Sequence, residues 1–177
     1  MSAEMEVAIL GGGCFWCLDA VYRQVRGVTT VETGYAGGPL ADPSHEQVAG
    51  GDTGHAHVVR LAFDPAIVSY HDLLEVFFTS HDPTTVDRQG SDIGTQYRSV
   101  IFARSPQQET VARQVIAEMA GVWDAPIVTQ VLPDQPFYRA SDEHQDYVAR
   151  NPLLSYCALV AAPKVDQFRA MYASLAR

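Results

Sequence analysis

The chain has few of the features that would tie it to a membrane or to a polyanion. Its 177 residues include no apolar run near the roughly 20 residues that a membrane-spanning helix needs. Only 12 Lys and Arg residues stand against 21 Asp and Glu residues, and these cations are scattered along the sequence. The net charge of −9 therefore argues against a nucleic-acid or acidic-membrane partner.

Cysteine is also scarce, and so is any sign of targeting. Residues 1–6 are acidic where a secretory signal would be basic, so we expect a cytoplasmic protein. Three cysteines are too few for a disulfide framework in a chain of this size. A chemically reactive role explains their presence better than structural disulfides do. Because no internal repeat, low-complexity tract or linker is present, we expect residues 1–177 to form a single domain.

Apolar periodicity predicts alternating strands and helices. Strands are expected at 7–10, 28–33, 55–63, 97–103 and 127–132. Helices are expected at 18–25, 70–79, 106–119, 141–150 and 164–176, with Ser69 as one N-cap and Pro106 at another first position. Two irregular loops, 34–44 and 81–94, separate them, and the first has too few apolar residues to be core. The pattern predicts a two-layer α/β or α+β domain.

The stretch Gly11–Cys17 follows the first predicted strand and precedes a helix. This order puts Cys14 at or near a helix N-terminus, where the dipole favours a thiolate and lowers the pKa of a cysteine. Cys17 follows one turn later on the same face, close enough for a disulfide. Phe15 and Trp16 place two aromatic rings beside the sulfur, which suits a substrate with an apolar methyl group.

Two plainer interpretations also fit these cysteines. Cys14 could be a buried structural cysteine, or it could form a zinc site together with Cys17, His55 and His57. His55 and His57 are two apart on a strand, so their side chains are expected to face one way. The flanking Phe and Trp crowd a four-coordinate metal, however, and for His55 we expect hydrogen bonding within the fold.

Two further segments carry candidate groups. Asp92 and Tyr97 lie in a polar, glycine-containing segment before a strand, and together they could bind and protonate an oxygen of a substrate. Taken alone, Tyr97 is also compatible with half-buried packing. Cys157 is far from Cys14 in sequence, and on its own it is compatible with an inert buried cysteine.

In combination these motifs resemble a known family. They are Gly13-Cys14-Phe15-Trp16, Gly54-His55-Ala56, His81-Asp82-Pro83-Thr84, Gly94-Thr95-Gln96-Tyr97-Arg98-Ser99, His144-Gln145, Asn151-Pro152, Tyr156-Cys157 and Pro163-Lys164. From about Val7 to Phe168 the chain resembles the type A peptide methionine sulfoxide reductases. The resemblance implies an α+β fold built on a ferredoxin-like mixed sheet, with packed helices and long irregular loops.

The resemblance also implies an activity and roles for the candidate residues. The activity is thiol-dependent reduction of (S)-methionine sulfoxide, free or in proteins, with thioredoxin as the reductant and no cofactor. Cys14 would attack the sulfoxide sulfur and become a sulfenic acid, which a second thiol converts to a disulfide. Cys17 is the favoured second thiol, and Cys157 remains a candidate or a second relay. Phe15 and Trp16 would hold the methyl group, and Tyr97, with Asp92 nearby, would bind the oxygen.

The chain departs from the family pattern at two positions. His57 stands where the family carries the Glu that protonates the sulfoxide oxygen, and His45 stands where it carries a Tyr that binds the same oxygen. Imidazolium is a competent acid, so we expect His57 to take over protonation and to give a bell-shaped pH dependence.

Other functions remain open at this point. A thioredoxin-like thiol-disulfide oxidoreductase would share the strand, Cys-x-x-Cys and helix order. A non-catalytic relative that has lost the acid would bind sulfoxide or zinc. We expect a monomer with thioredoxin and methionine sulfoxide as its partners.

Overall fold

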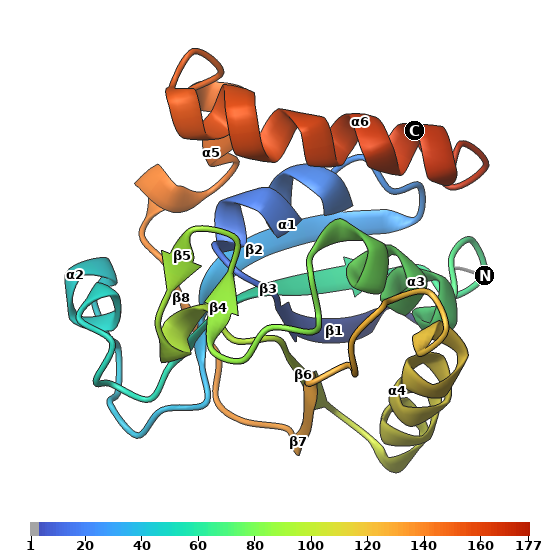
Figure 1. The fold of residues 1–177 in the computed structure, drawn as a ribbon, viewed down its shortest axis with the longest axis horizontal. Helices are drawn as coiled ribbons and strands as arrows, with labels where there is room; N and C mark the ends of the chain where they lie inside the picture. The colour runs from blue at the N-terminus through green and yellow to red at the C-terminus, as the bar shows by residue number, and fades with distance from the viewer. Residues whose placement is uncertain (1–3) are drawn as a thin grey trace.

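A computed structural model describes residues 4–177 as an α+β fold with a six-stranded mixed sheet (Figure 1). The strand order is β7–β6–β1–β3–β2–β8, and all neighbours are antiparallel except β6 and β7. The sheet strands are β1 (Glu6–Gly11), β2 (Val28–Ala36), β3 (Ala56–Phe63), β6 (Val100–Ala103), β7 (Gln130–Pro133) and β8 (Tyr138–Arg139). A separate small pair joins β4 (Arg88–Gln89) to β5 (Asp92–Ile93).

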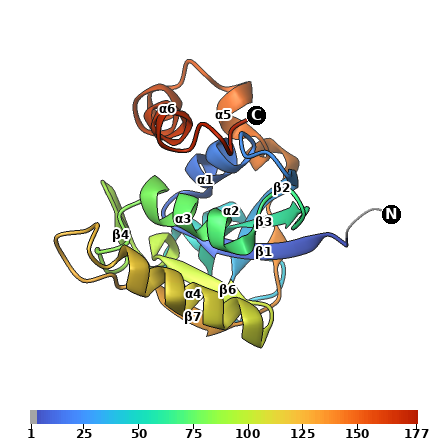
Figure 2. The same cartoon turned by 90° about the vertical axis from the view of Figure 1, so that its right-hand side faces the viewer.

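Within residues 4–177, six α-helices accompany the strands. They are α1 (Phe15–Tyr22), α2 (His45–Ala49), α3 (Tyr70–Ser80), α4 (Pro106–Met119), α5 (Tyr147–Arg150) and α6 (Ala162–Met171). Figures 1 and 2 show α6 lying across the outer side of α1, while α3 and α4 run next to each other. The α+β class predicted from the sequence is confirmed.

Side chains alternate between the two faces of the sheet, as the period of a strand requires. On β1, Ala8 and Leu10 join the main core cluster together with buried residues of α1, α3, α4 and α6. Ile9 points to the opposite face and joins a smaller cluster with Val58 and Phe102. All helices that contribute to the core therefore lie on one face of the sheet, the face from which the cysteine turn is built.

Two helix starts are fixed by local chemistry, as predicted. Ser69 accepts a hydrogen bond from Asp72 N, and Asp72 returns one to Ser69 N, which makes a capping box before α3. Ser105 accepts from Gln108 N, and Pro106 occupies the first position of α4. The predicted helices 70–79 and 106–119 are confirmed almost to the residue.

The first predicted loop is wrong in part. Strand β2 continues to Ala36 because Tyr35 and Ala36 pair with His57 and Ala56 of β3. Both residues are fully or almost fully buried, so this end of the loop does belong to the core. The short helix α2 was not predicted; it begins after Ser44, which caps it.

Three elements in the first 135 residues start three residues away from the predicted position. Helix α1 covers Phe15–Tyr22 rather than 18–25, so it starts directly after Cys14. Tyr97 belongs to a 3₁₀ turn, Thr95–Tyr97, and strand β6 starts only at Val100. Strand β7 covers Gln130–Pro133 rather than 127–132.

The C-terminal part is less regular than predicted. The expected helix 141–150 is a 3₁₀ turn at Asp142–His144 followed by the short α5. Asp146 between them has φ +52°, which interrupts an α-helix. The last helix starts earlier than predicted: a π-helical segment, Cys157–Ala161, leads directly into α6.

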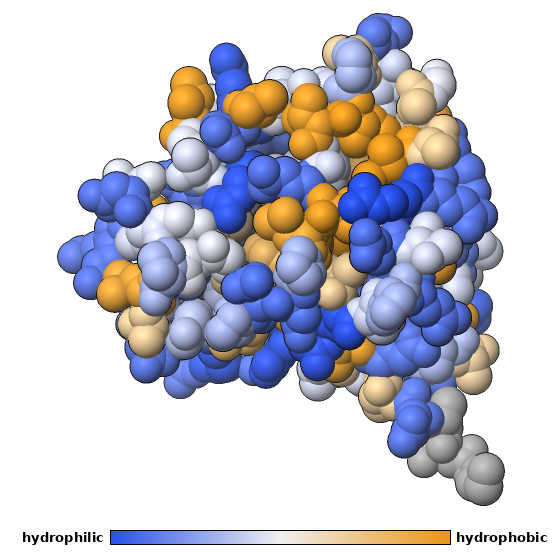
Figure 3. Space-filling model, turned by 90° about the horizontal axis from the view of Figure 1, so that it is seen from below, coloured by the Kyte–Doolittle hydropathy of each residue, from blue (hydrophilic) through white to orange (hydrophobic). Residues whose placement is uncertain are grey.

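The outer surface is mixed. Figure 3 shows hydrophobic residues gathered in patches among hydrophilic ones on the face seen from below. Among the described residues, no helix is both long enough and apolar enough to span a bilayer.

Candidate active site

Cys14 lies in the turn between β1 and α1, where it is the N-cap residue of the helix. The turn is tight: Gly13 has φ +87°, and a Cβ at Gly12 would lie 2.8 Å from the ring of His81. The imidazole of His81 is held in turn by Phe77 O at 2.6 Å and by the Ser99 hydroxyl at 2.8 Å. The glycines therefore let the chain pass a fixed, buried ring and deliver Cys14 to the start of the helix.

The structure corrects the expected electrostatics of Cys14. Only 8% of the residue is exposed, and this burial raises the pKa of the Cys14 thiol, with Cys17 adding to the rise. Hydrogen bonding by the Trp16 backbone lowers this pKa by less than burial raises it. Burial therefore opposes the effect of the helix N-terminus on the pKa of Cys14, and we expect the thiol proton to leave during the reaction.

Cys17 lies one turn along α1, with its backbone N–H donating to Cys14 O at 3.2 Å. Its Sγ lies 3.4 Å from the hydroxyl of Tyr156, and that hydroxyl donates to Asp92 Oδ2 at 3.2 Å. Asp92 also lines a cavity of about 160 Å³ together with Cys14, Tyr156 and Lys164. The structure therefore places Asp92 on the thiol side of the site.

The two aromatic residues after Cys14 have different surroundings. Trp16 stacks on Tyr147 of α5, with ring centroids 3.8 Å apart and an angle of 6° between the planes. Phe15 is fully buried, and its ring lies 4.2 Å from that of His57. Trp16 is half-buried, so of the two it is the ring that a ligand at Cys14 can reach.

His57 lies on β3 at the centre of a group of rings. His45 is 5.6 Å from it and Tyr97 is 5.2 Å from it, measured between ring centroids. His144 is the last residue of the 3₁₀ turn Asp142–His144. Its ring stacks on that of His45, with the ring centroids 4.3 Å apart. The structure therefore brings together three of the predicted residues, His45, His57 and Tyr97, and adds His144.

The environment of His57 corrects its expected role as an imidazolium. The residue is 1% exposed, and burial lowers its pKa to about 3, with His45 and His144 contributing in the same direction. Its imidazole is therefore neutral at physiological pH. A neutral imidazole still offers one N–H donor and one acceptor nitrogen.

Several polar atoms in this region are buried without a hydrogen-bond partner. They are both ring nitrogens of His57, Trp16 Nε1, the Tyr35 hydroxyl and His144 Nδ1. Buried polar groups are normally satisfied by protein, water or a ligand, and the gathering of five unsatisfied atoms here favours a bound polar partner. Trp16 Nε1 can only donate, and the other groups can each donate, so an oxygen that accepts hydrogen bonds fits this region.

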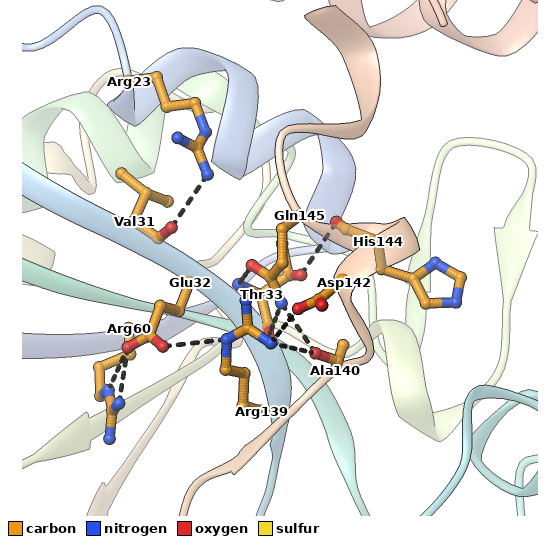
Figure 4. A network of polar contacts seen from close by, with 10 residues as sticks. All are labelled: Arg23, Val31, Glu32, Thr33, Arg60, Arg139, Ala140, Asp142, His144 and Gln145. Carbon is orange, nitrogen blue, oxygen red and sulfur yellow. Dashed lines mark hydrogen bonds and ion pairs between the residues drawn. The ribbon is translucent and has the colours of Figure 1, made fainter. Parts of the chain in front are cut away.

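His144 is held in place by an anchor at its neighbour Gln145 (Figure 4). Gln145 Oε1 accepts from Thr33 N at 2.8 Å, and its Nε2 donates to Thr33 O and to Ala140 O, each at 3.0 Å. The Thr33 hydroxyl also donates to His144 O at 3.0 Å. Figure 4 shows the His144 ring pointing away from this network. Strand β2 thereby fixes the C-terminal segment that carries His144.

His55 has the structural role expected of it. Its Nδ1 accepts from Gly38 N at 3.1 Å, and its Nε2 lies 2.7 Å from Leu40 O. The alternative zinc set of Cys14, Cys17, His55 and His57 is therefore not assembled. Within residues 4–177, the one set of side chains close enough to share a metal ion is His71, Glu75 and Glu118 on α3 and α4.

Cys157 lies at the start of the π-helical segment and is 1% exposed. Burial raises the pKa of its thiol. All three cysteines are free thiols. A π-helical turn is rare and is found often at functional sites, which is compatible with a role for Cys157 beyond packing.

Sequence reasoning did not select Tyr35, Tyr147, Tyr156 or Lys164 as site residues. Tyr156 and Lys164 belong to motifs that carried the family resemblance, so the signal was present. Tyr35 and Tyr147 reach the site only because β2 and α5 pack beside α1. No local sequence pattern predicts that packing.

Comparison with known proteins agrees with this geometry. The family model for peptide methionine sulfoxide reductase matches residues 6–175. The chain is 53% identical over 175 residues to the peptide methionine sulfoxide reductase MsrA of Ralstonia nicotianae, covering 96% of this chain and 92% of that protein. It is 55% identical over 167 residues to MsrA of Granulibacter bethesdensis, covering 93% and 90%.

Solved structures agree as well. The reduced form of Mxr1 from Saccharomyces cerevisiae has a TM-score of 0.82 and 33% identity, covering 85% of this chain and 88% of that one. Methionine sulfoxide reductase A of Corynebacterium diphtheriae has a TM-score of 0.79 and 34% identity, covering 85% and 76%. Mxr1 in complex with Trx2 shares the fold, with a TM-score of 0.59 and 24% identity over 83% of this chain and 89% of that one. The chain belongs to the peptide methionine sulfoxide reductase family.

Proposed function

We propose that this protein reduces (S)-methionine sulfoxide, free or in proteins, with Cys14 as the nucleophile. The observation that carries the proposal is the pairing of two unlike environments around Cys14. Cys17 lies one helical turn away on one side, and unsatisfied buried donors lie on the other. The first environment suits disulfide chemistry, and the second suits the oxygen of a sulfoxide.

The reaction divides into two steps at Cys14. In the first, the Cys14 sulfur attacks the sulfoxide sulfur, and the oxygen is transferred from the substrate to Cys14. Methionine leaves, and Cys14 becomes a sulfenic acid. In the second, Cys17 attacks the Cys14 sulfur, an S–S bond forms, the S–O bond breaks and water leaves. The one-turn separation of the two cysteines on α1 supports Cys17 as the second thiol.

The substrate oxygen is held by neutral donors in this proposal. His57 donates one N–H from β3, Tyr97 donates its hydroxyl, and the half-buried His45 completes this side. Burial also raises the pKa of Tyr97, so the phenol keeps its proton over the physiological range. Trp16 holds the methyl group of the substrate, and the buried Phe15 packs behind it against His57.

Thioredoxin regenerates the two thiols by exchange with the disulfide. The complex of yeast Mxr1 with Trx2 supports this choice of reductant. Cys157 serves as a second relay if the Cys14–Cys17 disulfide is passed on before thioredoxin acts. This role is supported by the packing of the segment that begins at Cys157 against α1, the helix that carries Cys17.

The remaining properties are also proposals. The order β6–β1–β3–β2 within the sheet supports describing the core as ferredoxin-like and two-layered. We propose that the whole chain works as one domain, as a monomer in the cytoplasm, without metal or other cofactor. Its three free thiols fit a reducing compartment.

The test is thioredoxin-coupled turnover with the separate S and R epimers of a methionine sulfoxide substrate. We expect turnover with the S epimer and none with the R epimer. An insulin-reduction assay run beside it addresses the alternative, a thioredoxin-like oxidoreductase. Insulin reduction without sulfoxide turnover would favour that alternative, and inactivity in both assays would favour a non-catalytic relative.

A further inference from the structure

We propose that Tyr156 and Asp92 form a proton relay that removes the thiol proton of Cys17 while Cys17 attacks the oxidised Cys14. This assignment rests on the proposed function and gives the second chemical step its own base. Tyr156 touches a reacting atom and is a catalytic residue, and Asp92 acts through Tyr156.

The direction of the relay follows from the hydrogen bonds. A tyrosine has one hydroxyl proton, and the proton of Tyr156 is donated to Asp92 Oδ2 at 3.2 Å. The Tyr156 oxygen is then left as the acceptor for the contact with Cys17 Sγ at 3.4 Å, so Cys17 S–H is the donor. The chain of donors runs from Cys17 through Tyr156 to Asp92.

Cys17 needs such a base because it is buried. The residue is 2% exposed, and burial raises the pKa of its thiol, so little thiolate is present before the reaction. The positive charge of Lys164 lowers the same pKa by less than burial raises it. Removing the proton during the attack avoids the need to form a free thiolate first.

The atoms balance along this path. As the S–S bond forms, the Cys17 proton moves to the Tyr156 oxygen and the Tyr156 proton moves to Asp92. The hydroxyl group of the Cys14 sulfenic acid leaves as the S–O bond breaks. Asp92 and Cys14 line one cavity of about 160 Å³, so the carboxylic acid can return the proton to that oxygen. The products are the disulfide and one water.

The relay is separate from the oxygen-binding half of the site. His57, Tyr97 and His45 form a ring cluster on the β3 side, whereas Tyr156 starts the segment that leads to α6. A change at Tyr156 should therefore affect the two chemical steps unequally, which makes the proposal testable.

The experiment uses Tyr156→Phe in a Cys157→Ser background, so that Cys17 is the one thiol left to resolve the sulfenic acid. After mixing with one equivalent of (S)-sulfoxide and no reductant, methionine release reports the first step. Loss of two thiols per chain reports disulfide formation, and a sulfenic-acid trap reports the intermediate. Tyr138→Phe on β8 is the matched control, because it removes a tyrosine hydroxyl outside the thiol chain.

We expect Tyr156→Phe to slow disulfide formation by about 10²-fold or more, the lower end for a lost acid–base group, with methionine release changed by only a few fold. The sulfenic acid should then accumulate. Asp92→Asn should slow the same step, and combining the two changes should add little, because both break one relay. The control should match the parent.

The pH dependence gives a readout that a structural role would not move. In the parent, the rate of disulfide formation should be nearly flat around neutral pH, because the relay deprotonates Cys17 during the attack. In Tyr156→Phe it should rise about tenfold per pH unit, since a preformed thiolate is then required.

Three results would overturn the relay. The first is disulfide formation that is unchanged in both variants. The second is an equal loss in methionine release and disulfide formation. The third is a parent enzyme whose own disulfide rate already rises about tenfold per pH unit; this measurement needs no variant at Tyr156. In each case (S)-sulfoxide turnover by the parent enzyme would still stand as a test of the proposed function.

Discussion

At the scale of single residues, the oxygen-facing half of the site carries two histidines where the family resemblance led us to expect a glutamate and a tyrosine. A buried glutamate is kept protonated by desolvation and can act as an acid, whereas desolvation keeps a buried histidine neutral. Because His57 is almost fully buried and its pKa is lowered to about 3, we assign it hydrogen-bond donation without proton transfer. From the sequence, His57 is expected to act as an acid. In the structure it is a neutral hydrogen-bond donor.

This assignment predicts the pH profile of the first step. The rate of methionine release should rise from about pH 6 towards about pH 9, because burial raises the pKa of Cys14 and the thiol must lose its proton. No alkaline decline should come from His57, which is already neutral above about pH 3. Single-turnover rates across this range check both statements.

His57→Phe tests the donor itself. Losing one donor to a developing oxyanion typically costs about 10²–10³-fold in rate, and we expect a loss of that size with the shape of the pH profile unchanged. His57→Gln keeps an N–H donor without a titratable ring and should lose less. A bell-shaped parent profile whose alkaline limb disappears in His57→Phe would instead show that His57 acts as an imidazolium acid.

At the scale of secondary-structure elements, the sequence was most informative where local chemistry decides the outcome. Ser69 and Ser105 cap the helices that follow them, and the glycine run before Cys14 marks a tight turn. It was least informative between residues 141 and 161. There Gln145 is tied to the backbone of β2, more than 100 positions away, and that contact replaces the predicted long helix by short turns.

The same limit applies to the site. The cysteine turn could be predicted because all of its chemistry lies within four residues. Tyr156 and Asp92 meet Cys17 only because segments from three parts of the chain converge. The sequence placed Asp92 beside Tyr97 and the substrate oxygen, whereas its hydrogen bond goes to Tyr156.

The anchor at Gln145 gives a prediction for this element. Gln145→Ala removes three hydrogen bonds and leaves the buried N–H of Thr33 without its partner, while Thr33 O keeps the bond from Ala140 N; the change should lower the free energy of unfolding by about 1–3 kcal/mol. Because His144 loses its support, the KM for sulfoxide should also rise. Denaturant unfolding and steady-state kinetics measure the two effects.

Gln107→Ala is the matched control for this change. Gln107 is exposed on α4, so its loss should alter the unfolding free energy by less than about 0.5 kcal/mol. If the two variants proved equally stable, the Gln145 network would be irrelevant to holding the C-terminal segment.

At the scale of the whole molecule, the fold buries an unusual amount of imidazole. Burial lowers the pKa of His57 to about 3 and that of His81 to about 4, both from 6.5, and it also lowers the pKa values of His45 and His144. These rings sit on both sides of the cysteine turn. The burial of these histidines therefore makes the free energy of unfolding of the protein depend on pH.

This burial predicts sensitivity to acid. Below pH 6.5 the unfolded chain takes up protons that the folded protein excludes, so the free energy of unfolding should fall as pH drops towards 4. Each buried histidine contributes a slope of up to about 1.4 kcal/mol per pH unit between its two pKa values, and the stabilisation is complete above pH 6.5. Urea unfolding at several pH values measures the slope.

His57→Phe should remove one such histidine and flatten the dependence. If its curve ran parallel to that of the parent protein, His57 would not be the neutral buried ring that the structure shows.

The central claim is that Cys14 takes the oxygen of (S)-methionine sulfoxide and is then resolved by Cys17. The most direct measurement is disulfide mapping by mass spectrometry after one turnover without reductant, on the parent protein and on Cys14→Ser. We expect one methionine per chain from the S epimer and a Cys14–Cys17 disulfide in the parent, and neither product in Cys14→Ser. Methionine released by Cys14→Ser, or a first disulfide that joins Cys14 to Cys157 even at the shortest reaction times, would contradict the account.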